Sequence, residues 1–320
     1  MKAKIPILEV VDLSVSFDVG RRKRLDAVCA VSFDLKKGET LGLVGESGCG
    51  KSSLARAVVQ LPRPSAGRVL FNGEDLARIG KGRLKQVRPR LQLIFQDSMA
   101  ALNPRRNVGQ TIAMPLVLMK EGNNIYRRSK VHEMMDAVGL DPDTIDHRPF
   151  QFSGGQCQRI QVARALMARP EILICDEPVS SLDVSVQAQI INLLEKMRVR
   201  FGLSMVFITH DIAVLKHMAD RVAVMYLGEM CEIAPNEALF AAPAHPYTAA
   251  LMAAVSSFPA DRVRWQMTRR DARVPSVLDP PPGCRFHPRC PCSRRVCTER
   301  KPQLTRIDAK RHVACHFPLS

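Results

Sequence analysis

Apolar and polar residues alternate over residues 7–17 and again over residues 27–35. A period of two is typical of strands with one buried face, so these segments predict a pair of antiparallel strands. Residues 68–72 continue the pattern. We therefore expect a small antiparallel β-subdomain near the start of the chain.

From residue 41 onward, short apolar runs alternate with longer segments of helical periodicity. The runs typical of buried strands cover residues 41–44, 91–95, 172–175, 204–209 and 221–227, and the helical segments cover 51–61, 156–168, 184–201 and 212–219. Alternation of strand and helix indicates a parallel sheet with crossover helices. Residues 98–152 differ, because 108–119 and 127–138 are both helical in pattern, and they predict a helical subdomain.

At 320 residues, the chain is long enough for one α/β domain of about 250 residues and an appendage. We expect the domain to cover residues 1–257 and a C-terminal extension to cover 258–320. Apolar stretches stay shorter than the roughly 18–20 residues that span a bilayer, and the first residues lack the apolar core of a signal peptide. The sequence therefore predicts a protein that stays in the cytosol and reaches a membrane only through partners.

A binding motif lies between the first of these apolar runs and the helix that follows it. Residues 45–52 read Gly-Glu-Ser-Gly-Cys-Gly-Lys-Ser, which fits the phosphate-loop pattern Gly-x-x-x-x-Gly-Lys-Ser/Thr. Glycine lets backbone N–H groups curl around an anion, and the following helix offers its positive N-terminus. In this pattern Lys51 reaches the β- and γ-phosphates and the Ser52 hydroxyl binds Mg²⁺. The sequence therefore predicts binding of a nucleoside triphosphate.

Polar residues follow two further predicted strands. Asp176 and Glu177 come directly after residues 172–175, and His210 follows the run 204–209. The carboxyl ends of parallel strands form the edge where ligands bind. Asp176 suits the Mg²⁺ ion and Glu177 suits the water that attacks the γ-phosphate, while His210 is a candidate for contact with that phosphate.

A Ser-Gly-Gly-Gln turn at residues 153–156 opens another helix and predicts a second anion site. Together with Gln96 and the segment 180–183, this turn resembles the signature of the ATPase subunits of ABC transporters, and the resemblance covers nearly the whole chain. The fold it implies is an α/β P-loop NTPase with an antiparallel β-subdomain, a helical signature subdomain and a small Cys-rich C-terminal extension. It also implies that two subunits close over ATP, with the signature of each facing the phosphate loop of the other.

The resemblance implies a set of site residues. The implied catalytic residues are Glu177, His210 and Gln96, and the implied Mg²⁺ ligands are Ser52, Gln96 and Asp176. The residues implied to contact ATP are Phe17, Gly45, Glu46, Ser47, Gly48, Cys49, Gly50, Lys51, Ser52, Ser53, Ser153, Gly154, Gly155, Gln156 and Asp183. Cys157 stands where the family usually has Arg, and we expect a weaker contact at the dimer interface there.

The sequence His-Pro-Tyr-Thr at 245–248 and the cysteine-bearing tail resemble the oligopeptide/dipeptide importer branch, and residues 45–52 and 182–189 resemble the second of its two ATPases. This implies an ATPase on the cytoplasmic face of the bacterial inner membrane that energises peptide uptake. The implied partners are a second ATPase in a heterodimer, two transmembrane permeases and an extracytoplasmic peptide-binding protein, without nucleic acid. Nickel or another small solute as cargo, and a soluble ABC ATPase acting on nucleic acid, remain as alternatives.

The C-terminal extension is rich in cysteine. Of the 10 cysteines, 5 lie in the last 37 residues. Cytosolic chains seldom keep disulfides, so the cysteines favour a bound metal in a segment that we expect to lack a core of its own. The importer resemblance implies a 4Fe–4S cluster on Cys284, Cys290, Cys297 and Cys315, with Cys292 as the spare. Structural zinc and free buried thiols remain as alternatives.

The extension is also basic. Residues 262–312 hold 14 Lys or Arg against 4 Asp or Glu, within a chain whose formal net charge is +16. Such an excess indicates an anionic partner surface, either nucleic acid or a membrane. For an ATPase docked at a membrane, we expect a solvated face near the phospholipid headgroups.

Overall fold

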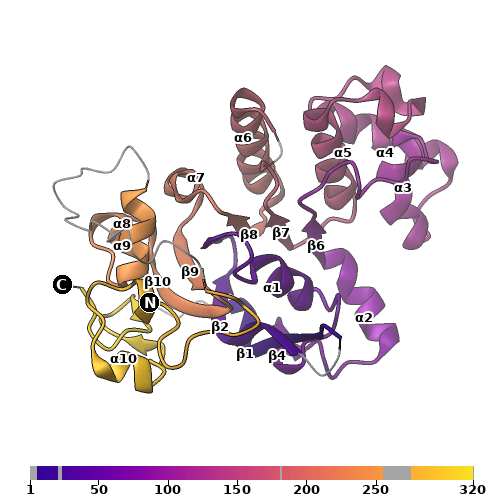
Figure 1. The fold of residues 1–320 in the computed structure, drawn as a ribbon. Helices are drawn as coiled ribbons and strands as arrows, with labels where there is room; N and C mark the ends of the chain where they lie inside the picture. The colour runs from indigo at the N-terminus through magenta and orange to yellow at the C-terminus, as the bar shows by residue number, and fades with distance from the viewer. Residues whose placement is uncertain (1–5, 21–23, 181, 255–274, 320) are drawn as a thin grey trace. The chain divides into compact units, whose positions relative to one another are not determined.

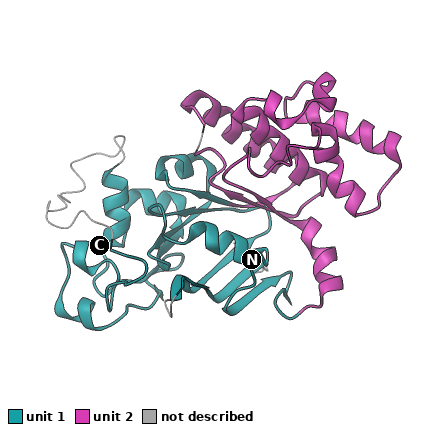
Figure 2. Cartoon of the chain, turned by 45° about the vertical axis from the view of Figure 1, so that its right-hand side comes forward, with its two compact units in different colours: residues 1–78, 207–320 teal, residues 79–206 magenta. Residues whose placement is uncertain are grey.

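The computed structural model describes residues 6–20, 24–180, 182–254 and 275–319. The chain forms two compact units, which Figure 2 colours separately: unit 1 contains residues 1–78 and 207–320, and unit 2 contains residues 79–206. The predicted domain boundary after residue 257 lies outside the described residues. Among those that are described, no helix is both long and apolar enough to cross a bilayer.

Unit 1 contains the predicted antiparallel β-subdomain. Its strands are β1 (Pro6–Asp18), β2 (Arg24–Lys36), β4 (Ala66–Phe71) and β5 (Glu74–Asp75), in the order β2-β1-β4-β5. Strands β1, β2 and β4 correspond to the three segments predicted from alternation. On β1 the burial alternates as expected, because Leu13 and Val15 are buried while Ser14 and Ser16 are partly exposed. Strand β2 begins at Arg24, directly after residues 21–23, which lie outside the described residues.

The second sheet of unit 1 has a parallel pair, β3 (Thr40–Val44) and β9 (Arg221–Tyr226), followed by β10 (Glu229–Pro235), which is antiparallel to β9. Every residue of β3 is buried, as its apolar run predicts. The last residues of β8 (Ser204–Thr209) border β3 on its other side. Before the C-terminal residues, the described helices of this unit are α1 (Lys51–Val58), α7 (Ile212–Met218), α8 (Asn236–Ala241) and α9 (Pro246–Ala253).

The C-terminal residues of unit 1 are built onto this sheet, as Figure 1 shows in yellow. They form η6 (His287–Arg289), α10 (Arg295–Glu299), β11 (Thr305–Arg306) and β12 (His312–Val313). Strand β12 pairs with β10, and the Phe286 ring centroid lies 5.3 Å from those of both Tyr226 and Tyr247. The extension therefore does not rely on a core of its own, as expected, because Phe286 joins a core whose other members come from β9 and α9.

Unit 2 contains the predicted helical segments. Its elements are α2 (Lys81–Val87), η1 (Arg88–Arg90), β6 (Leu91–Ile94), α3 (Val108–Leu118), α4 (Asn124–Ala137), η2 (Pro142–Asp146), η3 (Pro149–Gln151), α5 (Gly154–Met167), β7 (Ile172–Asp176) and α6 (Val184–Phe201), and the start of β8. Strands β6 and β7 are parallel. Helices α3 and α4 correspond to the two helices predicted in the segment 98–152, which are therefore confirmed. Helices α3, α4 and α5 pack on one another.

Candidate functional site

The phosphate loop of unit 1 connects β3 to α1. Lys51 opens the helix and is 3% exposed, and its Nζ donates to the backbone oxygens of Gly45 at 2.8 Å and Glu46 at 3.1 Å. Through these two hydrogen bonds, the Lys51 side chain lies against the backbone at the start of the loop. The local arrangement of strand, loop and helix is the one that the motif requires.

Two glycines of the loop fit closely against neighbouring backbone. A Cβ at Gly45 would lie 2.1 Å from the oxygen of Met225, and one at Gly50 would lie 2.1 Å from the oxygen of Ala27. Gly50 also has a φ of 101°, in the left-handed region that favours glycine. Strands β9 and β2 therefore fix the loop from outside, and residues with side chains are excluded at these two positions.

Phe17 and His210 also belong to unit 1. Phe17 lies near the end of β1 and is partly exposed, and His210 directly follows β8 and is exposed. Asp211 next to it caps α7, because its carboxylate accepts the N–H of Ala213 at 2.8 Å. Both side chains are therefore accessible to a ligand, and their contacts with ATP stay predictions.

In unit 2 the predicted carboxylates end a buried strand. Asp176 is the last residue of β7 and fully buried, and Glu177 follows with a φ of 46°. A non-glycine residue in this backbone region is strained, and such strain is concentrated at functional sites. The parallel pairing of β6 with β7 brings the residues after both strands to one edge. Gln96 Nε2 accordingly donates to Glu177 Oε2 at 3.1 Å.

The signature turn begins helix α5 of unit 2. Ser153 is its N-cap: the Ser153 hydroxyl accepts the N–H of Gln156 at 3.3 Å, and the Gln156 side chain accepts the N–H of Ser153 at 2.9 Å. Gly154 and Gly155 form the first turn, where backbone N–H groups have no partner within the helix. Asp183 is the exposed N-cap of α6. The turn therefore presents a helix N-terminus, the arrangement that binds anions.

Cys157 does not lie on the surface of unit 2. Its side chain is fully buried, and its thiol lies 3.1 Å from Met99 Sδ and 3.5 Å from the oxygen of Pro149. Burial raises the pKa of this thiol above its ordinary value. The Cys157 side chain therefore packs inside unit 2, and the expected weaker contact at the dimer interface stays a prediction.

Comparison with known proteins decides the family. The chain matches the family described as "ABC transporter" over residues 28–180 and that described as "Oligopeptide/dipeptide transporter, C-terminal region" over residues 231–297. It is 45% identical over 326 residues to the oligopeptide transport ATP-binding protein AppF of Bacillus subtilis, with 97% of each chain covered. It is also 45% identical to OppF of Salmonella typhimurium, over 93% of this chain and 92% of that one. The chain belongs to the oligopeptide/dipeptide family of ABC transporter ATP-binding subunits.

Solved structures agree with this assignment. The dimeric structure of the ATP-binding cassette MJ0796 in a post-hydrolysis state, bound to ADP and Pi, matches with a TM-score of 0.66 and 27% identity, covering 72% of this chain and 98% of that one. For cbiO1 from Clostridium perfringens, part of the ABC transporter complex cbiONQ, the TM-score is 0.65 with 27% identity, over 74% and 91% of the two chains. The predicted ABC ATPase fold is confirmed. The protein is an ATPase coupled to transport, and ATP is its nucleotide.

The cysteines of this ABC subunit's C-terminal extension surround one small cavity. The cavity of about 10 Å³ is lined by Cys284, Cys290, Cys292, Cys297 and Cys315, together with His245, His287 and His316 among others. Burial raises the pKa of Cys284 to about 11 and that of Cys290 to about 12. In the described ranges, no group of three or more His, Cys, Asp or Glu is arranged to hold a single metal ion. The donor set is nonetheless of the thiolate type that iron–sulfur clusters use.

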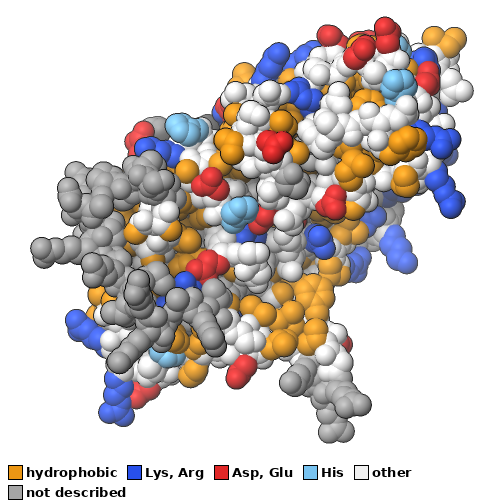
Figure 3. Space-filling view, turned by 45° about the horizontal axis from the view of Figure 1, so that its top comes forward, with side chains coloured by type: hydrophobic (Ala, Val, Ile, Leu, Met, Phe, Trp, Pro, Cys, Tyr) orange, Lys and Arg blue, Asp and Glu red, His pale blue; other side chains and the backbone are white. Residues whose placement is uncertain are grey.

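Several basic residues of the extension are paired within the chain. The ion pairs are Arg285 with Glu229 at 3.0 Å, Lys301 with Glu229 at 2.8 Å, Arg289 with Glu46 at 2.8 Å and Arg311 with Asp308. On the face that Figure 3 draws, Lys and Arg side chains of the described residues are interspersed with acidic and apolar ones. Part of the basic excess is therefore neutralised within the protein, which weakens the argument for an anionic partner.

Two residues that no sequence pattern indicates contact the phosphate loop of this ABC subunit. Tyr247 accepts the backbone N–H of Glu46 with its hydroxyl oxygen at 2.9 Å, and Arg289 contacts the Glu46 carboxylate. Tyr247 lies in the His-Pro-Tyr-Thr sequence, and Arg289 precedes Cys290. Both segments were recognised as features of the importer branch, but neither carries a pattern that indicates contact with the phosphate loop.

Proposed function

We propose that this ATPase energises the import of di- or oligopeptides at the cytoplasmic face of the bacterial inner membrane. The observation that carries the proposal is the match of residues 231–297 to the C-terminal region of oligopeptide/dipeptide transporters, together with the oligopeptide transport relatives. Its partners are two transmembrane permeases, an extracytoplasmic peptide-binding protein and a second homologous ATPase. No nucleic acid takes part.

Identification of the cargo tests this function. The complex is purified with its binding protein, and the ligand that the binding protein carries is identified by mass spectrometry. We expect short peptides. Nickel or another small solute in place of peptides would contradict the proposed cargo, and copurification of the ATPase with ribosomes instead of permeases would contradict the transport role.

The roles of the site residues follow the family. Lys51 holds the β- and γ-phosphates, Phe17 stacks on the adenine and His210 contacts the γ-phosphate. Ser52, Gln96 and Asp176 offer the oxygen ligands that suit Mg²⁺, which neutralises phosphate charge when it is bound. Glu177 orients and polarises the attacking water, and the hydrogen bond from Gln96 supports this role because it fixes one of the two carboxylate oxygens.

A groove in the helical part of unit 2 supports contact with a permease. The groove has a volume of about 600 Å³ and is lined by residues of α3 and α4, among them Gln110, Met114, Val117 and Arg128. Beyond the lining, Ile125 near the start of α4 is 81% exposed. We propose that a short cytoplasmic helix of the permease docks in this groove, whose lining combines apolar and polar side chains, and moves with the helical segment.

We further propose that the working unit is a heterodimer in which each signature turn completes the partner's nucleotide site. The exposed position of Ser153 at a helix N-terminus supports this role, as does the dimeric state of the MJ0796 cassette. The same turn would otherwise be a second anion site in a chain with only one phosphate loop.

Four cysteines of the extension suit an iron–sulfur cluster. We propose Cys284, Cys290, Cys297 and Cys315 as the ligands, because they line one cavity and Cys292 is the exposed member of the five. The cluster would act as a structural bridge between these chain segments. Buried thiols with raised pKa values remain protonated at neutral pH, so ligation must release protons.

Metal analysis tests the cluster. Anaerobic purification should give a brown protein with visible absorbance and about four irons per chain. Cys292→Ser should keep the iron, whereas Cys297→Ser should lose most of it. A colourless protein with one zinc would favour a zinc module, and a protein without metal would favour free thiols.

A further inference from the structure

Arg289, in the C-terminal extension, is fixed against the phosphate loop. Its Nη1 and Nη2 each donate to one oxygen of the Glu46 carboxylate at 2.8 Å, and Nη1 also lies 3.1 Å from the hydroxyl of Tyr226. The guanidinium lies 5.6 Å and 5.7 Å from the ring centroids of Tyr226 and Phe286. The arginine side chain is only 7% exposed. A bidentate pair of this kind is strong and fixed in direction.

Glu46 places a carboxylate in a loop that binds a polyanion. It is the second residue of the motif, and its backbone oxygen accepts a hydrogen bond from Lys51 Nζ at 3.1 Å. A free carboxylate at this position would repel the triphosphate, since like charges at short range in a partly buried site are poorly screened. Arg289 supplies the opposite charge. Although burial opposes it, the hydrogen bonds to Glu46 and Tyr226 raise the pKa of Arg289 above its ordinary value, so the arginine remains charged.

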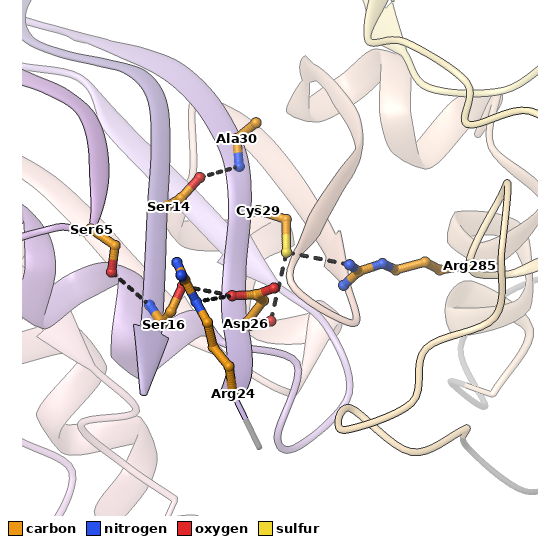
Figure 4. Close-up of polar contacts among 8 residues, drawn as sticks. All are labelled: Ser14, Ser16, Arg24, Asp26, Cys29, Ala30, Ser65 and Arg285. Carbon is orange, nitrogen blue, oxygen red and sulfur yellow. Dashed lines mark hydrogen bonds and ion pairs between the residues drawn. The ribbon is translucent and has the colours of Figure 1, made fainter. Parts of the chain in front are cut away.

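A second arginine of the same segment reaches the other end of the loop. Arg285 pairs with Glu229 at 3.0 Å and donates to the oxygen of Leu227. It also lies 3.3 Å from the Cys29 sulfur, a contact that Figure 4 shows. The next residue after Leu227, Gly228, donates its N–H to the oxygen of Cys49 at 2.8 Å. Within residues 284–290, Arg289 therefore contacts Glu46 at the start of the phosphate loop directly. Arg285 contacts the turn at Leu227 and Gly228, which in turn is hydrogen-bonded to Cys49 later in the loop.

We propose that Arg289 is a positioning residue for ATP binding, which compensates the charge of Glu46 and holds the loop around the triphosphate. The C-terminal extension then forms part of the nucleotide site of its own subunit. The inference rests on the proposed role of the Lys51 loop in holding the phosphates. The ATP affinity of the wild-type chain tests that role separately.

The test compares ATP affinity among variants of the full-length chain, measured by calorimetric titration with Mg-ATP. Arg289→Met should weaken ATP binding by about tenfold or more, because it leaves a carboxylate unpaired beside the anion site. Arg289→Lys should be intermediate, since it keeps the charge and loses the bidentate geometry. Arg295→Met is the matched control, because that arginine is 91% exposed in the same extension and should leave the affinity unchanged.

The double variant separates charge compensation from a purely structural role. If Arg289 acts by neutralising Glu46, then Glu46→Gln combined with Arg289→Met should bind ATP more tightly than Arg289→Met alone. Equal weakness of the single and double variants would overturn the proposal, as would wild-type affinity in Arg289→Met. If Arg289→Met does not fold, the lysine variant decides: unchanged affinity in a folded Arg289→Lys chain overturns the bidentate positioning role. Failure of the wild-type chain to bind ATP would instead overturn the role of the Lys51 loop.

Discussion

Replacing Glu177 by Gln should reduce ATP turnover by roughly 10²–10⁴-fold while ATP still binds. The amide keeps the size of the side chain and an oxygen that can accept the hydrogen bond that Gln96 now gives to Glu177. It loses the negative charge that, in the proposed mechanism, polarises the attacking water. Steady-state phosphate release and the Kd for ATP, measured on the same preparation, separate the chemical step from binding.

Glu171→Gln is the matched control for this variant. Glu171 lies just before β7 and pairs with Arg90 at 2.5 Å, on the same strand segment but at its opposite end. The same substitution there should leave turnover close to that of the wild type. Turnover at the wild-type rate in Glu177→Gln would show that the water is activated by another group.

The parts of this protein that the sequence predicted well are those determined by neighbours along the chain. The phosphate loop needs a strand before Gly45 and a helix from Lys51, and both are visible as local patterns. Gln96 and Glu177 could be placed at strand ends in the same way, although 81 residues separate them. Parallel pairing of β6 with β7 then brings them together, because their strands end at one edge of the sheet.

The parts that escaped prediction depend on tertiary contacts. Arg289 and Glu46 lie 243 residues apart, and no periodicity links a tail arginine to a loop carboxylate. The core around Phe286 was missed for the same reason, since the extension alone has too few apolar residues to form one. The left-handed backbone at Glu177 likewise has no signature in its residue type.

Ser153→Arg should abolish ATP hydrolysis in the complex without weakening ATP binding to the chain's own Lys51 loop. In the proposed heterodimer the signature turn serves the partner's nucleotide, so a long cationic side chain at this exposed helix N-terminus blocks closure over ATP. The change also removes the cap of α5, which costs about 1 kcal/mol of stability. ATPase activity is measured with the partner ATPase present, and ATP affinity is measured on the isolated chain.

Two further variants separate the interface from the cap. Ser153→Ala loses the same cap but adds no bulk, so it should retain more activity than Ser153→Arg. Ser129→Arg, at an exposed position of α4, makes the same change away from the signature and should leave hydrolysis unchanged. If Ser153→Ala is as inactive as Ser153→Arg, the hydroxyl itself or the cap is the essential feature. Normal ATP-dependent closure of Ser153→Arg with the partner ATPase would contradict the head-to-tail arrangement, because the signature would then lie away from the nucleotide between the subunits.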